Sequence, residues 1–289
     1  MRNIKQIIGI VMYSLYNLIF SKKFAIFLAV VVIFCSYTFG GLNDIAEFYG
    51  VKTSAYVFPF YLSNPSMMLI FGALNIYLFS DVPFTEPDTY FVLSRTNRKN
   101  YYIGKVIYIF IASAMVTAIF ALLPMLLIFP NADFSNEWGK IIYTLIANSQ
   151  MVREQADASL GFAVNSLVVE KFTPLAAMAY AMILMTSVVF FMGTLILFVG
   201  IMVSRSASFV VSGFFVSLSY FAVFLGYISF GGVLYFISPF SWCSLNWLDL
   251  YGSGLAPSPL QAMAELIGLS AVLGLTAFFK FNYSDLKIQ

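Results

Sequence analysis

Histidine is absent from this 289-residue chain, and its absence excludes several kinds of chemistry. A Ser–His pair, an H-E-x-x-H zinc site and a histidine-ligated haem cannot be built from these side chains alone. Cysteine occurs only as Cys35 and Cys243, too few for a disulfide framework or a cysteine-based metal site. We therefore expect no metal site, and we expect both thiols to be packing residues.

Motifs that bind phosphate or carry a nucleophile are also missing. The chain has no G-x-x-x-x-G-K-[ST] motif, because Gly104-Lys105 and Gly139-Lys140 lack the upstream glycine and the following Ser or Thr. It has no G-x-S-x-G elbow either. The sequence thus predicts a protein that is not an enzyme and binds no ATP or other cofactor directly.

Charge is scarce as well. Charged residues make up 10% of the chain and hydrophobic residues 61%, above the roughly 45–50% apolar content of soluble domains. The net charge of +2 leaves no basic surface of the kind that binds nucleic acid. Apolar runs of about 20 residues recur, and each can cross a ~30 Å hydrocarbon layer as a helix. We therefore expect an all-α polytopic membrane protein with one transmembrane domain, 1–289.

The N-terminal segment 3–20 has the periodicity of an amphipathic helix. Its apolar residues fall on one helical face, namely Ile4, Ile7, Ile8, Val11, Leu15, Leu18 and Ile19. This pattern favours a helix that lies in the membrane interface. A signal peptide is the competing interpretation, but no small-residue cleavage site follows, and Ser21-Lys22-Lys23 leads directly into the next apolar run.

Six transmembrane helices are expected. They cover about 24–39, 58–79, 106–129, 174–203, 209–230 and 260–279. Between spans three and four, the segment 130–173 is expected to form an external insert of two short amphipathic helices. Between spans five and six, the aromatic, Gly- and Pro-rich segment 231–259 is expected to form short helices that re-enter the outer leaflet.

The distribution of Lys and Arg predicts the orientation, since basic residues collect on the cytoplasmic side. The N-terminal helix, the loop 80–105, the turn at Arg205 and the tail from Lys280 carry eleven of the 15 Lys and Arg residues. The opposite side carries four, namely Lys52, Lys140, Arg153 and Lys171. Both termini and the loop 80–105 are therefore predicted to be cytoplasmic.

The stretch 83–105 combines charge with an apolar run. It holds six charged residues around Tyr90-Phe91-Val92-Leu93. Pro87 suits the first turn of a helix, Asp88 suits its positive end, and Arg95 and Arg98 suit its negative end. We expect a short helix over 85–99, parallel to the membrane, with more apolar surface than a solvated loop needs.

The order of these elements resembles the permease subunit of an ABC transporter of the type-2 exporter class. In many such permeases the first cytoplasmic loop has a Glu, a run of apolar residues, a Ser-Arg pair and a Gly-Lys. Those positions correspond here to Glu86, Phe91-Val92-Leu93, Ser94-Arg95 and Gly104-Lys105. The broken aromatic segment before span six is similar to the short outer helices of that class, whereas the insert 130–173 is longer than many members carry.

The resemblance implies partners and a role for the loop. The helix 85–99 would be the coupling helix and would seat in a separate ABC ATPase subunit, which binds the ATP and Mg²⁺. Its contacts would come from Thr85, Glu86, Asp88, Tyr90, Phe91, Leu93, Arg95 and Arg98. A second permease, identical or related, would complete the path, which implies a multi-pass protein of a bacterial plasma membrane that exports an amphipathic peptide or a lipid-like substrate.

A substrate path can be sought among polar and aromatic residues near the outer face. Glu265, about one turn into span six, is the main acidic residue inside a predicted span, and Trp242 and Trp247 suit the interface. These three residues are candidates for the path. A non-transporting membrane scaffold or sensor subunit is the alternative, and an ion-coupled secondary transporter is disfavoured because the spans hold so little charge.

Overall fold

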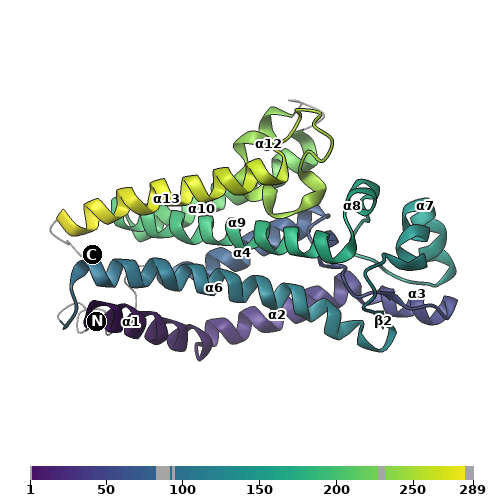
Figure 1. Cartoon of the computed structure of the whole chain (residues 1–289), viewed down its shortest axis with the longest axis horizontal. Coiled ribbons are helices and arrows are strands. Elements are labelled where there is room, and N and C mark those ends of the chain that lie inside the picture. The colour runs from purple at the N-terminus through teal and green to yellow at the C-terminus, as the bar shows by residue number, and fades with distance from the viewer. Residues whose placement is uncertain (1, 83–91, 93–94, 227–231, 284–289) are drawn as a thin grey trace.

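The computed structural model describes residues 2–82, 92, 95–226 and 232–283. These described residues are 79% helical with almost no strand. Long helices run side by side along the longest axis of the molecule, and short helices gather at one end (Figure 1). The long elements are α1 (Arg2–Ile19), α2 (Lys22–Phe39), α4 (Pro65–Leu78), α6 (Arg98–Leu127), α9 (Pro174–Met202), α10 (Arg205–Phe221) and α13 (Pro259–Tyr283).

We call the two ends of this bundle proximal and distal. At the proximal end α1 begins, α6 begins and α13 ends, as Figure 1 shows. The distal end carries α3 (Gly41–Tyr49), α7 (Gly139–Gln155) and α8 (Ser166–Lys171). It also holds a two-stranded parallel pairing of β1 (Thr53–Ser54) with β2 (Ala132–Asp133). The helix α1 thus begins at the end of the bundle where α13 ends (Figure 1), and the cytoplasmic location of this end stays a prediction.

Five helical stretches are long and apolar enough to cross a membrane within the described residues. They are Lys22–Tyr49, Arg98–Leu127, Pro174–Met202, Arg205–Leu225 and Pro259–Asn282. The architecture therefore fits a multi-pass membrane protein. The first of these stretches joins α2 to α3, and α10 continues into a π-helical turn, Ala222–Gly226.

The predicted count of six spans is not confirmed, because the second predicted span, 58–79, forms a much shorter helix. Only the 14 residues of α4 are α-helical there, and they rise about 21 Å. The 3₁₀ turns η1 (Phe58–Phe60) and η2 (Phe79–Asp81) flank α4. Pro65 is the first residue of α4, where its missing N–H costs nothing, and Asn64 caps the helix with its side chain. The α-helix therefore cannot extend back over η1.

The helix α9 forms the centre of the bundle. It packs against α13, α6, α10 and α4, and a larger share of it is buried than of any other helix that could span. Its apolar residues lie on all sides, which is typical of a helix surrounded by protein. The two-residue gap between α9 and α10 then reverses the chain, and Ser204 caps α10 by accepting a hydrogen bond from Ala207 N at 3.2 Å.

The helices α1 and α2 lie one after the other along α6 (Figure 1). Asn100 Nδ2 donates to Gln6 Oε1 at 2.7 Å, and a Cβ added at Gly104 would lie 2.8 Å from Ile10. Four residues further along α6 thus correspond to four residues further along α1, so the two helices run in the same direction. The amphipathic helix predicted over 3–20 therefore forms, and its buried face packs on α6. Its location in the membrane interface stays a prediction.

The external insert differs from its prediction in one respect. The pattern Leu160, Ala163, Val164, Leu167 and Val168 predicts a second amphipathic helix, but α8 begins only at Ser166. The preceding residues are extended because their backbone groups bind other segments. Gly161 N donates to Thr38 O at 3.2 Å, and Ala163 N donates to Ser63 Oγ at 2.9 Å. Asn165 then caps α8 by accepting a hydrogen bond from Leu167 N.

Replacement of Gly41 by Ala should loosen this distal docking. An added Cβ at Gly41 would lie 2.3 Å from the backbone oxygen of Ser159, and backbone atoms cannot rotate away as a side chain can. We expect a loss of about 1–3 kcal/mol in the free energy of unfolding, measured by thermal unfolding in detergent. Gly9→Ala is the matched control, because no atom lies within 4 Å of its added Cβ. Equal stability of the two variants would contradict the close approach.

Candidate functional site

Most of the predicted coupling helix lies outside the described residues. This applies to Thr85, Glu86, Asp88, Tyr90, Phe91 and Leu93. Of its C-terminal part, Val92 and Arg95 are helical, and Thr96 Oγ1 donates to Val92 O at 2.7 Å. The predicted boundary at residue 99 is wrong. Arg98 and Lys99 form the first turn of α6, which begins after Asn97, so they belong to the long helix.

Three charged side chains form a cluster next to the point where the chain enters the predicted coupling helix. Asp81, in η2, is two residues before position 83, where the described residues are interrupted. Its Oδ1 lies 2.6 Å from Lys23 Nζ and 3.5 Å from Arg205 Nη2. Lys23 Nζ also donates to Ser80 Oγ at 2.7 Å and lies 5.9 Å from the centre of the Tyr77 ring. We call Lys23, Asp81 and Arg205 the root cluster.

Each member of the root cluster stands at the unfavourable end of its own helix. Lys23 and Arg205 occupy the first turns of α2 and α10, where the helix dipole is positive, and Asp81 follows α4, where it is negative. Contact between the three charges offsets these costs. Their side chains are between 32% and 49% exposed, so solvent screens the attraction, and the cluster acts through position more than through stability. It joins the exit of α4 to the starts of α2 and α10.

The root cluster marks one level along the bundle. A Cβ added at Gly193 would lie 2.4 Å from Ile109 and 3.6 Å from Phe79, so Phe79 and Ile109 share that level. From Ile109 to Leu127, α6 rises about 27 Å, close to the ~30 Å of a hydrocarbon core. From Ile109 back to Arg98, α6 projects a further ~16 Å at the proximal end. The cluster therefore lies about one hydrocarbon thickness from the distal end of α6.

A buried lysine lies on the projecting part of α6. Lys105 is 3% exposed, and Lys105 Nζ donates to Ser14 Oγ of α1 at 2.9 Å. The ammonium group also lies 5.6 Å and 5.5 Å from the centres of the Tyr101 and Tyr108 rings. Ring faces attract cations, so they compensate part of the lost hydration. Lys105 thus holds α1 against α6, a role that its position in a predicted charged loop did not indicate.

The three substrate-path candidates each make a separate hydrogen bond. Trp242 is 1% exposed and donates its only N–H to Tyr235 O, whereas Trp247 is half-buried and donates to Leu62 O. Glu265 accepts a hydrogen bond from Gln261 one turn earlier in α13. Within the described chain, no hydrogen bond or ring contact joins Glu265 to either tryptophan. Trp247, with a partly exposed ring, is the tryptophan that a substrate could reach.

The segment 231–259 forms a short α12 (Val233–Ile237) and the 3₁₀ turns η5 (Pro239–Cys243) and η6 (Leu245–Trp247). After them, Asp249 organises a loop by accepting hydrogen bonds from the N–H groups of Tyr251, Gly252 and Gly254. Burial raises the pKa of the Asp249 carboxyl, but these N–H groups together outweigh burial and hold the pKa below its ordinary value.

This loop docks on α8. Tyr251 Oη donates to Glu170 Oε2 at 2.9 Å, and Lys171 Nζ lies 4.3 Å from the centre of the Tyr251 ring and donates to Leu250 O. The hydrogen bond to Glu170 raises the pKa of Tyr251. The two predicted outer segments, 130–173 and 231–259, are therefore in direct contact at the distal end.

No group of three His, Cys, Asp or Glu side chains suited to a metal ion occurs among the described residues. The sequence pattern did not predict the root cluster, because its members are 58 or more residues apart. A usable signal was present: Lys23, Asp81 and Arg205 each stand at a boundary of a predicted span.

Comparison with known proteins found no matching family model, no matching curated protein and no matching solved structure.

Proposed function

We propose that this chain is the membrane-spanning permease subunit of an ATP-driven ABC exporter. The root cluster is the observation that carries the proposal. It joins η2, which ends two residues before position 83, to the first turns of α2 and α10, so we expect a force applied to the chain after η2 to reach two long helices at once. This is the mechanical requirement of a coupling element driven by a separate ATPase.

The remaining features support the same reading. At the proximal end the projecting part of α6 packs with α1 and the end of α13, and we call these three helix ends the collar. A collar of this kind, on the basic and therefore cytoplasmic side, suits the docking of a soluble subunit. The substrate we propose is an amphipathic peptide or a lipid-like molecule, and a second permease completes its path.

Ion-coupled transport fits the structure less well. Lys105 is the one buried charged side chain among the described residues, and it lies on the projecting part of α6. No described Asp or Glu is buried, whereas a proton or sodium relay usually places a carboxylate inside the spans. The proposed energy source is therefore a separate ATPase.

Purification from the native membrane in mild detergent tests the proposal. We expect a P-loop ATPase to copurify with the wild-type chain, and we expect Phe91→Asp to remove it, because an ionised side chain cannot enter an apolar groove without a large desolvation cost. Phe134→Asp is the matched control, since Phe134 is 53% exposed at the distal end. Recovery of the wild type without any ATPase would favour the scaffold or sensor alternative.

A further inference from the structure

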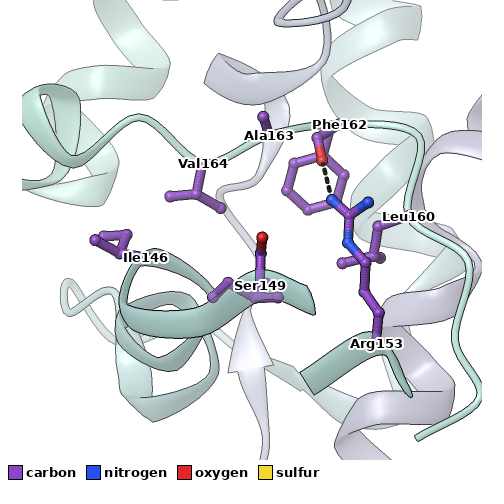
Figure 2. A pocket seen from close by; sticks show the side chains of 8 residues that line it. Ile146, Ser149, Arg153, Leu160, Phe162, Ala163 and Val164 are labelled. Carbon is purple, nitrogen blue, oxygen red and sulfur yellow. Dashed lines mark hydrogen bonds between the residues drawn. The ribbon is translucent and has the colours of Figure 1, made fainter. Parts of the chain in front are cut away.

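The distal cap contains a small cavity between α7 and the extended segment that precedes α8. Its volume is about 160 Å³. Leu145, Ile146, Leu160, Phe162 and Val164 supply apolar walls, and Ser149 and Arg153 supply the polar groups. Ser149 and Arg153 are four residues apart on α7, so they share one face of the helix. In Figure 2 the Ser149 hydroxyl and the Arg153 guanidinium both face the extended segment that carries Phe162.

The guanidinium group is held in place but not neutralised. Arg153 Nη2 donates to Phe162 O at 3.0 Å, which fixes the plane of the group (Figure 2). Arg153 Nε is shielded from solvent and has no hydrogen-bond partner. None of the ion pairs in the described part of the chain involves Arg153. The neighbouring carboxylate of Glu154 accepts a hydrogen bond from Gln150 instead.

A half-buried cation with an unsatisfied N–H is unfavourable unless an anion or water reaches it. The cavity is large enough for a small group, and the Ser149 hydroxyl, which bonds no other described residue, faces the same space. A guanidinium N–H and a hydroxyl bind carboxylate oxygens well, because a hydrogen bond to an ionised acceptor is shorter and stronger than a neutral one.

The geometry points to a binding site for the carboxylate end of a single-chain amphiphile. The carboxylate oxygens accept hydrogen bonds from the guanidinium group of Arg153 and from Ser149 Oγ, and the first methylenes of the chain contact Leu145, Leu160 and Val164. The combination of one cation with apolar walls selects an anionic head joined to an apolar chain over a neutral molecule of the same length. This site does not require ATP or a partner subunit, so its test is independent of the proposed permease function.

Octanoate binding by the purified full chain in lipid nanodiscs tests the site. Calorimetry should show saturable binding of octanoate and at least tenfold weaker binding of octanol, which has the same chain without the charge. Arg153→Gln should weaken octanoate binding at least tenfold, because the charge-assisted bond is lost. Lys140→Gln removes an exposed cation from the same helix, outside this cavity, and should leave binding unchanged.

A second variant guards against misfolding of the first. Ser149 lines the cavity and is exposed to solvent, so Ser149→Leu should remove the hydroxyl and fill the opening of the cavity while the bond between Arg153 and Phe162 remains. It should also weaken octanoate binding at least tenfold with an unchanged melting temperature. Equal binding of octanoate and octanol, equal effects of Arg153→Gln and Lys140→Gln, or the absence of saturable binding would each overturn the proposal.

Discussion

Reversal of the charge at Asp81 should uncouple ATP hydrolysis from transport. In Asp81→Arg, three cations would meet where the root cluster now holds one carboxylate between Lys23 and Arg205. Lys23 and Arg205 would then stand at the positive ends of α2 and α10 with no compensating anion. We expect η2 to separate from both helices, so that movement of the chain after η2 no longer reaches them.

The expected size of the effect follows from typical coupling energies. Energetic coupling between sites is usually worth 1–3 kcal/mol, or about 5–150-fold. We therefore expect ATP-dependent transport in proteoliposomes to fall roughly tenfold or more, while the ATPase still copurifies. The melting temperature should change little, because these side chains are between 32% and 49% exposed and exposed ion pairs contribute little stability.

Two further variants make this prediction specific. Glu47→Arg is the matched control, because Glu47 is an exposed carboxylate of α3 at the distal end, and we expect its transport to match the wild type. Exchange of the charges, Asp81→Lys with Lys23→Asp, should restore part of the lost transport, since an opposite-charge pair would again join η2 to α2. Normal transport in Asp81→Arg would remove the root cluster from the mechanism, and so would a transport loss that the exchange of charges fails to reverse at all.

The sequence predicted the long helices well because their signal is local. The runs that form α9 and α13 agree with their predicted spans to within a few residues at each end. Apolar content alone carries that information, since a helix that crosses or fills a bundle needs about 20 apolar residues. The short helix predicted over 160–168 does not form as predicted, because non-local contacts decide its structure. Its apolar spacing suits a helix, but the backbone N–H groups of this segment donate to Thr38 and Ser63 instead of to its own carbonyls.

Predicted spans are less reliable where prolines interrupt an apolar run. The segment 58–79 is mostly apolar, yet Pro59 and Pro65 divide it into a 3₁₀ turn and the short α4. The candidate site was harder still to predict. The sequence predicted that its charged residues lie in cytoplasmic segments. The contacts of Asp81 with Lys23 and Arg205, however, depend on how α2, α4 and α10 pack, and no local sequence pattern determines that packing.

Lys105 illustrates the same limit and leads to the largest expected effect on folding. It was grouped with the charged loop residues, yet it is 3% exposed between α1 and α6. Lys105→Glu would place a carboxylate against the faces of Tyr101 and Tyr108, which repel anions as they attract cations. We expect a loss of roughly 3–5 kcal/mol, the range for an uncompensated buried charge.

Hydrogen exchange and thermal unfolding would measure this loss. In Lys105→Glu the amides of α1 should exchange much faster, because Lys105 Nζ no longer binds Ser14 and the close approach of Gly104 to Ile10 no longer holds. Lys99→Glu reverses an exposed charge six residues earlier in α6 and should change stability by no more than about 0.5 kcal/mol. If both reversals had the same small effect, α1 would not be held through Lys105, and the collar at the proximal end would rest on its apolar contacts alone.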